Sequence, residues 1–140
     1  MKNKLLTISL ILLVTITLVG VLALIVVMKF NEEEAKEPSI DEVIAASVDV
    51  PELTTNLLSG DYIRISFKVQ TDSKKAKEEL EKRDFQVKNI IIEELSEMKS
   101  DQLQGKEGKQ QLETTIKDKA NSLMQEGKIE KVYITSYMIQ

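Results

Sequence analysis

The sequence predicts an α+β domain, with two helices on one face of a small β-sheet, behind a single membrane-spanning helix. Three observations lead to this prediction. Residues 5–28 are apolar and carry no charge. Residues 62–70 alternate between polar and apolar side chains, which is typical of a strand with one buried face. After residue 73, two stretches carry apolar residues at helical spacing, and a last apolar run closes the chain.

The run from Leu5 to Met28 is long enough to cross a membrane as a helix. At about 1.5 Å per residue it would extend roughly 36 Å, and a bilayer hydrocarbon core is about 30 Å thick. A cleaved signal peptide is the alternative, but its apolar core is only about 7–15 residues long and ends in a small-residue cleavage site. This run leads instead into "MKFNEEE". We therefore expect an uncleaved anchor in contact with membrane lipid at residues 5–28.

Lysines near the ends of the anchor predict its orientation. Lys2 and Lys4 precede it together with the α-amino group, whereas Lys29 and Lys36 follow it among several glutamates. Positive residues favour the cytoplasmic side of a membrane, and acidic residues count little in this rule. We expect residues 1–4 to be cytoplasmic and the larger C-terminal part to be extracytoplasmic.

A charged linker is expected at residues 29–47, since "KFNEEEAKEP" ends at a proline. Ser39 and Glu42 have the spacing of a capping box, which predicts a short helix within this linker. We expect the outer α+β domain to occupy residues 48–140. Its first strand, residues 48–58, contains Pro51 and is therefore predicted to be an edge strand or an entry strand of the sheet.

Two helices are predicted between the strands. The first begins with an exposed, highly charged stretch after Ser73 and continues into a stripe of Val87, Ile91, Leu95 and Met98, broadened by Ile90 and Ile92. Gly105 and Gly108 interrupt the pattern. The second helix carries Leu112, Ile116, Ala120 and Leu123 on one face, with Gly127 at the position just past its end.

A closing strand is predicted at residues 129–139, beside residues 63–69 or an equivalent strand. Its pattern places Val132, Ile134 and Met138 on one face, and Tyr133, Thr135 and Tyr137 on the other. The order of elements in the outer domain is therefore strand, strand, helix, helix, strand.

The composition argues against an enzyme. The chain has no cysteine and no histidine, which removes the usual nucleophile–base pairs and the commonest metal ligands. Serines beside lysines, such as Ser73 beside Lys74, are expected to cap helices or form turns. The carboxylate pairs at 78–79 and 93–94 are expected to be solvated, since adjacent helical positions point in different directions. We expect no catalytic residue, metal or other cofactor.

Charge and aromatic content also exclude a nucleic-acid partner. The outer part carries 16 basic and 23 acidic residues, and the whole chain has only two arginines and no tryptophan. Nucleic-acid binders instead show a basic face with stacking aromatic residues. Two classes of function remain: a membrane-anchored assembly protein, and a single-pass receptor or wall-associated module that binds an external ligand. The scarcity of aromatic residues for a ligand pocket favours assembly.

The chain resembles the flagellar basal-body-associated protein FliL family. The resemblance is strongest in "TNLLSGDYIRISFKVQ" and in the segment from "SDQLQGKEGKQQ" to "KVYITSYMIQ". The residues that match the family pattern are Asn56, Leu57, Leu103, Gly108, Leu112, Asn121, Val132, Tyr133, Thr135, Ile139 and Gln140. Ile129, Ile134, Tyr137 and Met138 differ from the family's usual residues but keep the apolar character of a strand.

This resemblance implies a single-pass inner-membrane protein whose outer domain is similar to the core of stomatin- and prohibitin-like (SPFH) proteins. It also implies a non-enzymatic role in the flagellar basal body: a homo-oligomeric ring around the stator units that supports motility and swarming. By analogy with the family, the stator would be contacted by the linker residues Lys29, Phe30, Asn31, Glu32, Glu33, Glu34 and Pro38. The anchor contains no ionisable residue, as expected of a protein without an ion path of its own.

Overall fold

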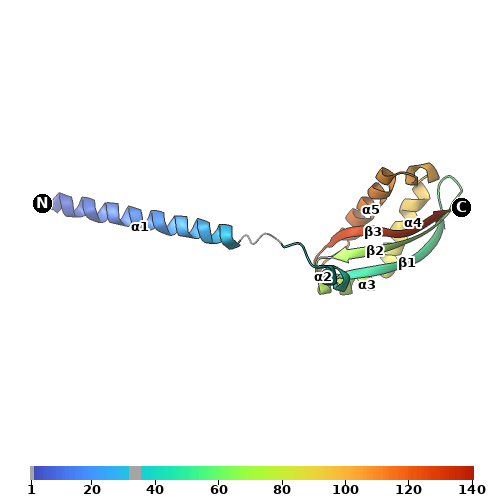
Figure 1. Cartoon of the computed structure of the whole chain (residues 1–140), viewed down its shortest axis with the longest axis horizontal. Coiled ribbons are helices and arrows are strands. Elements are labelled where there is room, and N and C mark those ends of the chain that lie inside the picture. The colour runs from blue at the N-terminus through green and yellow to red at the C-terminus, as the bar shows by residue number, and fades with distance from the viewer. Residues whose placement is uncertain (1, 32–35) are drawn as a thin grey trace. The chain divides into compact units, whose positions relative to one another are not determined.

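The computed structural model describes residues 2–31 and 36–140. The chain divides into two compact units, residues 1–37 and 38–140, and each is described by itself (Figure 1). The first unit contains helix α1 (Lys2–Asn31), which is long and apolar enough to cross a membrane. Within it, the hydroxyls of Thr7, Thr15 and Thr17 donate hydrogen bonds of 2.6–2.7 Å to backbone carbonyls of the same helix. The helix therefore satisfies these polar groups without a partner.

Three antiparallel strands form the sheet of the second unit, in the order β1-β2-β3. They are β1 (Ser47–Asn56), β2 (Tyr62–Thr71) and β3 (Ile129–Ile139). The central strand β2 pairs with β3 from Ile63 to Thr71, which confirms the predicted place of the closing strand. β1 is an edge strand, and its register with β2 shifts between Val50 and Leu53. Pro51 lies inside this irregularity, and edge strands and bulges are the positions of a sheet where proline is found.

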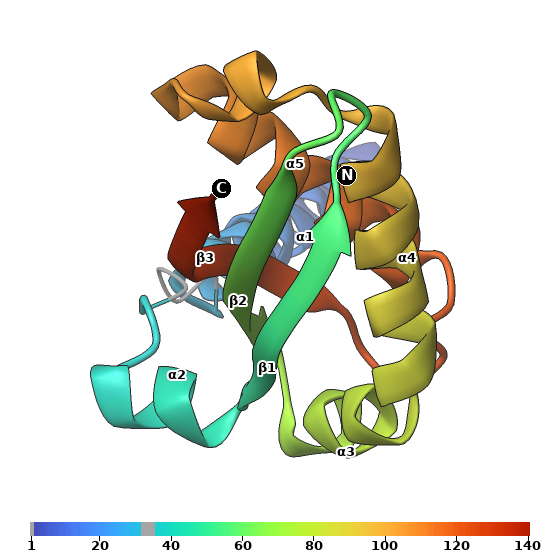
Figure 2. The ribbon, with the colours of Figure 1, turned by 90° about the vertical axis from the view of Figure 1, so that its right-hand side faces the viewer.

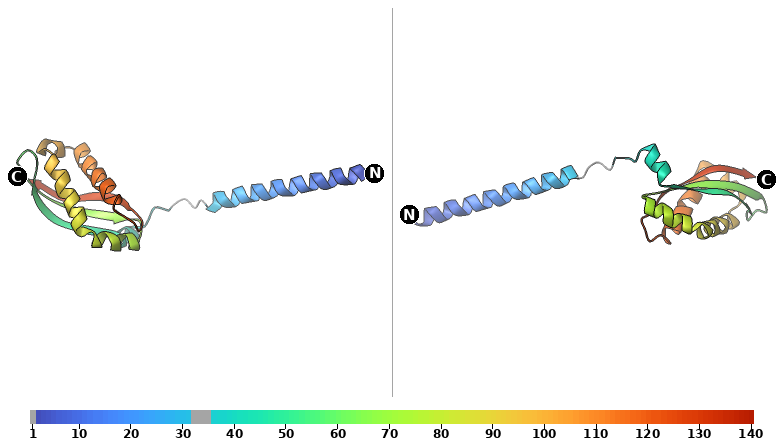
Figure 3. Two further views of the ribbon diagram at one scale, coloured as in Figure 1. Left: turned by 180° about the vertical axis from the view of Figure 1, so that it is seen from behind. Right: turned by 90° about the horizontal axis from the view of Figure 1, so that it is seen from below.

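Five helical segments complete the unit: α2 (Ile40–Ala45), α3 (Lys74–Lys82), α4 (Asp84–Glu97), the 3-10 helix η1 (Ser100–Leu103) and α5 (Lys106–Asn121). The predicted capping box at the start of α2 is confirmed, because Ser39 and Glu42 each accept the other's backbone N–H, at 3.3 and 2.7 Å. α4 and α5 lie along one face of the sheet (Figure 2). α2 lies on the opposite side of the strands from α3 (Figure 3, right).

The core fills the layer between the sheet and the helices α3, α4 and α5. Its apolar side chains come from alternate positions of β2, as predicted, and from one face of each helix. They are Val50, Leu57, Ile63, Ile65, Phe67, Val69, Leu80, Val87, Ile91, Leu95, Leu103, Leu112, Ile116, Ala120, Ile129 and Val132.

The prediction of two helices is wrong, because the first of them is broken at Arg83 into α3 and α4. Arg83 adopts a non-helical conformation (φ −92°, ψ 12°). Its N–H donates to the carbonyls of Glu79 and Leu80 and so completes the last turn of α3. The break lets α3 pack Ala76 and Leu80 against one end of the sheet while α4 follows the strands. Ile92, predicted to broaden the buried stripe, is instead exposed on α4.

The predicted end of the second helix at Gly127 is also wrong, since α5 ends at Asn121. The side-chain amide of Asn121 accepts a hydrogen bond from the Ile129 N–H at 2.7 Å and donates one to the Ile129 carbonyl at 3.0 Å. These bonds tie the helix end to the start of β3. Gly127, with φ +77°, lies in the turn between them, a backbone conformation that favours glycine.

The predicted alternation along β3 holds only from Val132 to Ile134. The register with β2 shifts between Ser66 and Phe67, so that Ile134 lies opposite Phe67 whereas Tyr137 lies opposite Ile65. The extra residue reverses the faces beyond it. Tyr137 therefore lies on the helix-covered side, with the Lys109 ammonium 4.1 Å from its ring centre, and Met138 lies on the outer face opposite Arg64.

Candidate interaction surfaces

The serines and carboxylates with possible catalytic spacing are structural in this fold. Ser73 caps α3, as predicted, by accepting the N–H of Ala76 at 3.1 Å. The N–H of Ser100 donates to the Ser59 hydroxyl at 3.1 Å, which joins η1 to the β1–β2 turn. Among the described residues, no three His, Cys, Asp or Glu side chains are grouped so that they could hold a metal ion. The serines named above thus serve a helix cap and a turn, and the described carboxylates do not group around a common point.

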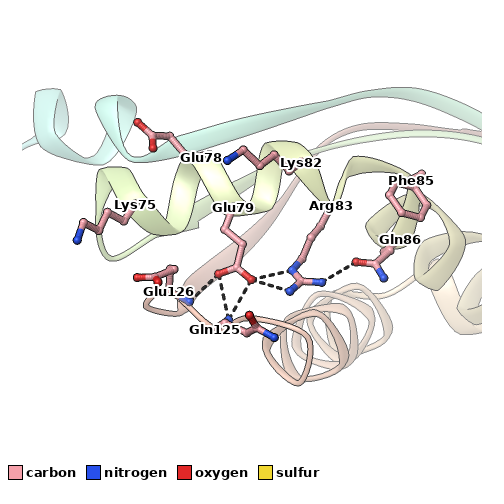
Figure 4. Close-up of a pocket in the computed structure, with 9 residues that line it drawn as sticks. All are labelled: Lys75, Glu78, Glu79, Lys82, Arg83, Phe85, Gln86, Gln125 and Glu126. Carbon is pink, nitrogen blue, oxygen red and sulfur yellow. Dashed lines mark hydrogen bonds and ion pairs between the residues drawn. The ribbon is translucent and has the colours of Figure 1, made fainter.

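The expectation that Glu79 is solvated is wrong. Its side chain is only 13% exposed and pairs with Arg83 at 2.8 Å. The carboxylate also accepts the backbone N–H groups of Gln125 and Glu126, at 3.0 and 2.6 Å (Figure 4). Burial alone would raise the pKa of Glu79, but the bonds from Glu126, Arg83 and Gln125 outweigh it and hold the pKa below its ordinary value of 4.5. Glu79 thus fastens α3 to the loop that leads into β3.

A hollow of about 630 Å³ surrounds this cluster. It is lined by Lys75, Glu78, Glu79, Lys82, Arg83, Phe85, Gln86, Gln125 and Glu126 (Figure 4). The Arg83 guanidinium donates hydrogen bonds to the Glu79 carboxylate and, at 2.9 Å, to the Gln86 side-chain carbonyl. The guanidinium is therefore not available to bind an anion. The lining mixes both signs of charge around one exposed ring, Phe85, and this favours no particular class of small ligand. The spacing of Glu79 and Arg83, four apart on a helix, is the sequence signal for this ion pair.

Several residues that match the family pattern meet around η1 and the loops beside it. Leu57, Leu103 and Leu112 are buried in the core. Gly108, in the first turn of α5, lies directly against the backbone carbonyl of Gln102, where a Cβ atom has no room. Asn56 ends β1 opposite Tyr62 and is exposed. These positions support the packing of the loops and do not converge on a cavity.

The remaining matching residues order β3. Val132 is buried, the Tyr133 hydroxyl donates to Gln70 at 3.0 Å, and the Thr135 hydroxyl bonds that of Ser66 at 3.2 Å. Asn121 holds the start of the strand. At its end, Gln140 exchanges two backbone hydrogen bonds with Tyr62, at 2.8 and 2.9 Å. The last residues of the chain are thus paired along the central strand.

The linker residues predicted to contact the stator are distributed between the two units. Lys29, Phe30 and Asn31 form the end of α1. Glu32, Glu33 and Glu34 lie outside the described residues. Pro38 is exposed at the start of the second unit, beside α2.

The outer face of the sheet, opposite α3–α5, is mostly polar. The side chains of Tyr62, Arg64, Ser66, Lys68 and Gln70 alternate along β2 on this face. Lys68 pairs with Asp49 of β1 at 2.9 Å. Arg64 makes no ion pair with any described residue. α2 lies on this side of the strands, whereas α3 lies on the other (Figure 3, right).

Comparison with known proteins gives concordant results. Residues 47–140 match the family model described as flagellar basal body-associated protein FliL. The chain is 55% identical over 112 residues to a flagellar protein FliL of Bacillus subtilis (strain 168), covering 80% of this chain and 79% of the relative. It is 29% identical over 79 residues to a flagellar protein FliL of Aquifex aeolicus (strain VF5), covering 56% of this chain and 49% of that relative.

Proposed function

The chain belongs to the FliL family of flagellar basal-body-associated proteins, and from this we propose that it supports flagellar motor function as a homo-oligomeric ring around the stator units. The observation that carries the proposal is the match of the entire outer domain, residues 47–140, to that family. In this proposal α1 anchors each copy as a single-pass membrane helix, with the N-terminus in the cytoplasm and the outer domain outside. The lysines before and after the anchor support that orientation.

The proposed ring depends on packing between domains rather than on a continuous sheet. β1 and β3 are both edge strands, and unprotected edges invite strand addition between copies. Pro51 lies in β1 and has no backbone N–H to offer to an added strand. On β3, the Ile134 N–H at the bulge donates a hydrogen bond of 2.9 Å to the Glu113 carboxylate of α5, so it cannot pair with an added strand. These blocked edges favour side-by-side domains, the arrangement that the SPFH-like relationship implies.

The torque-generating ion path is assigned to the stator and not to this protein. Between Leu5 and Met28 the anchor has no ionisable side chain that could relay a proton or bind an ion. We propose that the contact with the stator is made by the linker, through Lys29, Phe30, Asn31, Glu32, Glu33, Glu34 and Pro38. A receptor function is less well supported, since the hollow near Phe85 is lined mainly by charged and amide side chains.

Motility of a deletion strain tests this function. The swimming speed in viscous medium and the rate of swarming should both fall, because motors under load depend most on their stators. The full chain should restore both, whereas residues 1–37 alone should not. Unchanged speed under load in the deletion strain would remove the proposed role in the motor while leaving the family membership intact.

A further inference from the structure

Among the exposed apolar side chains of the second unit, one group lies on α2 and another on the outer face of the sheet, and the two groups differ in composition. The α2 patch consists of Ile40, Asp41 and Ile44, with the two isoleucines 69% and 55% exposed on one face of the helix. The sheet patch consists of Tyr62, Arg64 and Met138 on the outer face, where Tyr62 and Met138 are 57% and 52% exposed. Each patch places a charged side chain beside two large apolar ones.

The two patches lie at opposite ends of β2 and cannot meet within one chain. The end of α2 is tied to Thr71, whose N–H and hydroxyl both donate to the Ala46 carbonyl, at 3.0 and 2.6 Å. The sheet patch lies at the other end, around Tyr62. Residues 62 and 71 of an extended strand are separated by about 30 Å. A contact between the patches therefore requires two molecules.

The charges of the patches are complementary. Asp41 and Arg64 are both exposed, and neither forms an ion pair with a described residue. An acidic helix is repelled by anionic lipid, which argues against the membrane surface as the site where α2 binds. The sheet patch offers what the α2 patch lacks: a cation between two apolar side chains.

We propose that the α2 patch of one copy docks on the sheet patch of the next, with the isoleucines against Tyr62 and Met138 and Asp41 facing Arg64. This inference rests on the proposed function and identifies the surfaces that would build the ring. The contact is heterologous, because it joins two different patches. Each copy carries one α2 patch and one sheet patch, so contacts can continue from copy to copy, and they form a ring when the rotation between copies closes. Anchoring by α1 raises the local concentration of copies, and a small contact then suffices.

Thiol cross-linking of the full chain in membranes tests this contact, and the natural sequence has no cysteine to interfere. The double variant Ile44→Cys/Met138→Cys is treated with a short bis-maleimide. A head-to-tail contact predicts a ladder of trimers and larger products, because every copy carries both partners. The matched control is Ile44→Cys/Thr114→Cys, since Thr114 is exposed on α5, over the other face of the sheet. The control should give no ladder.

Charge reversal gives a second readout. Asp41→Arg or Arg64→Asp alone should lower the yield of the ladder about fivefold, and the two together should restore it. Equal ladders from both cysteine pairs, or dimers only, would overturn the proposed contact. Multimers with a lysine-directed cross-linker but no thiol ladder would overturn it while leaving a ring built on other surfaces. Monomers with both reagents would contradict the ring as well.

Discussion

Removal of the last eight residues, 133–140, should unfold the outer domain rather than trim a tail. The lost segment covers one side of the central strand, where Ile139, Tyr137 and Ile134 lie opposite Ile63, Ile65 and Phe67. The three β2 side chains are among the most completely buried in the domain. Their exposure therefore opens the middle of the sheet side of the core to water.

The size of this effect follows from the buried side chains. Complete burial of an isoleucine or phenylalanine contributes about 1.5–3 kcal/mol. If truncation exposes roughly half of each of the three β2 side chains and removes the partly buried Ile134 and Ile139, the loss is about 5 kcal/mol. Small domains have a total stability of about 5–15 kcal/mol, so this change is a large fraction of the whole.

Thermal and urea unfolding of residues 38–140, with and without the truncation, measures the loss. The expected result is either a fall in Tm of about 20–40 °C or no cooperative transition at all. Ser136→Ala is the matched control, because that side chain is exposed and the backbone of β3 is kept; its Tm should stay close to that of the unchanged domain. A truncated domain that melts cooperatively within a few degrees of the control would refute the role assigned to β3.

Three further substitutions test particular contacts by unfolding measurements. Gly108→Ala places a Cβ on a backbone carbonyl of η1 and should cost about 1–3 kcal/mol. Gly105→Ala, with open space around it, should cost only about 0.5 kcal/mol, because Gly105 is the N-cap of α5 and alanine is less favourable there. Asn121→Ala leaves the N–H and carbonyl of Ile129 without their partner and should cost about 1–3 kcal/mol; a loss near zero would mean that water replaces the amide. Because the folded-state pKa of Glu79 is lowered, its stabilisation is fully present above pH 4.5 and is lost as the pH falls below it. The stability difference between the wild type and Glu79→Gln should therefore shrink below pH 4.5, and a difference independent of pH would contradict the assignment.

The strands were predictable because their signals are local. β2 lies in the middle of the sheet with one covered and one open face, so burial follows its alternating sequence directly. The bulge in β3 was not predictable in this way, since it depends on which residue of β2 lies opposite. A shift of one residue exchanges the faces on which Tyr137 and Met138 lie, and the strand's own sequence carries no signal for it.

The sequence does not predict the break between α3 and α4, for a related reason. Leu80 and Val87 are seven residues apart, so the apolar stripe stays in phase through Arg83 and is compatible with one long helix. The break is accompanied by contacts of Glu79 with backbone groups of Gln125 and Glu126, which are remote in the sequence. Long-range contacts of this kind leave no periodic pattern.

The candidate surfaces were predictable only in part. The anchor follows from composition, and the family-pattern residues follow from a resemblance that the comparisons confirm at the level of the family. The α2 and sheet patches required the structure, because their exposure depends on which face of each element the core covers. The proposed contact of Lys29–Pro38 with the stator remains a prediction.

Imaging of basal bodies inside cells by electron cryotomography tests the ring around the stator most directly. Cells that carry the full chain, cells that lack it and cells complemented with Asp41→Arg should be compared. The proposed function predicts ring-shaped density around each stator on the outer side of the membrane, present with the full chain and absent after deletion. The proposed contact between the α2 and sheet patches predicts that this density is depleted in the variant. The same density around the stators of cells with and without the protein would contradict it.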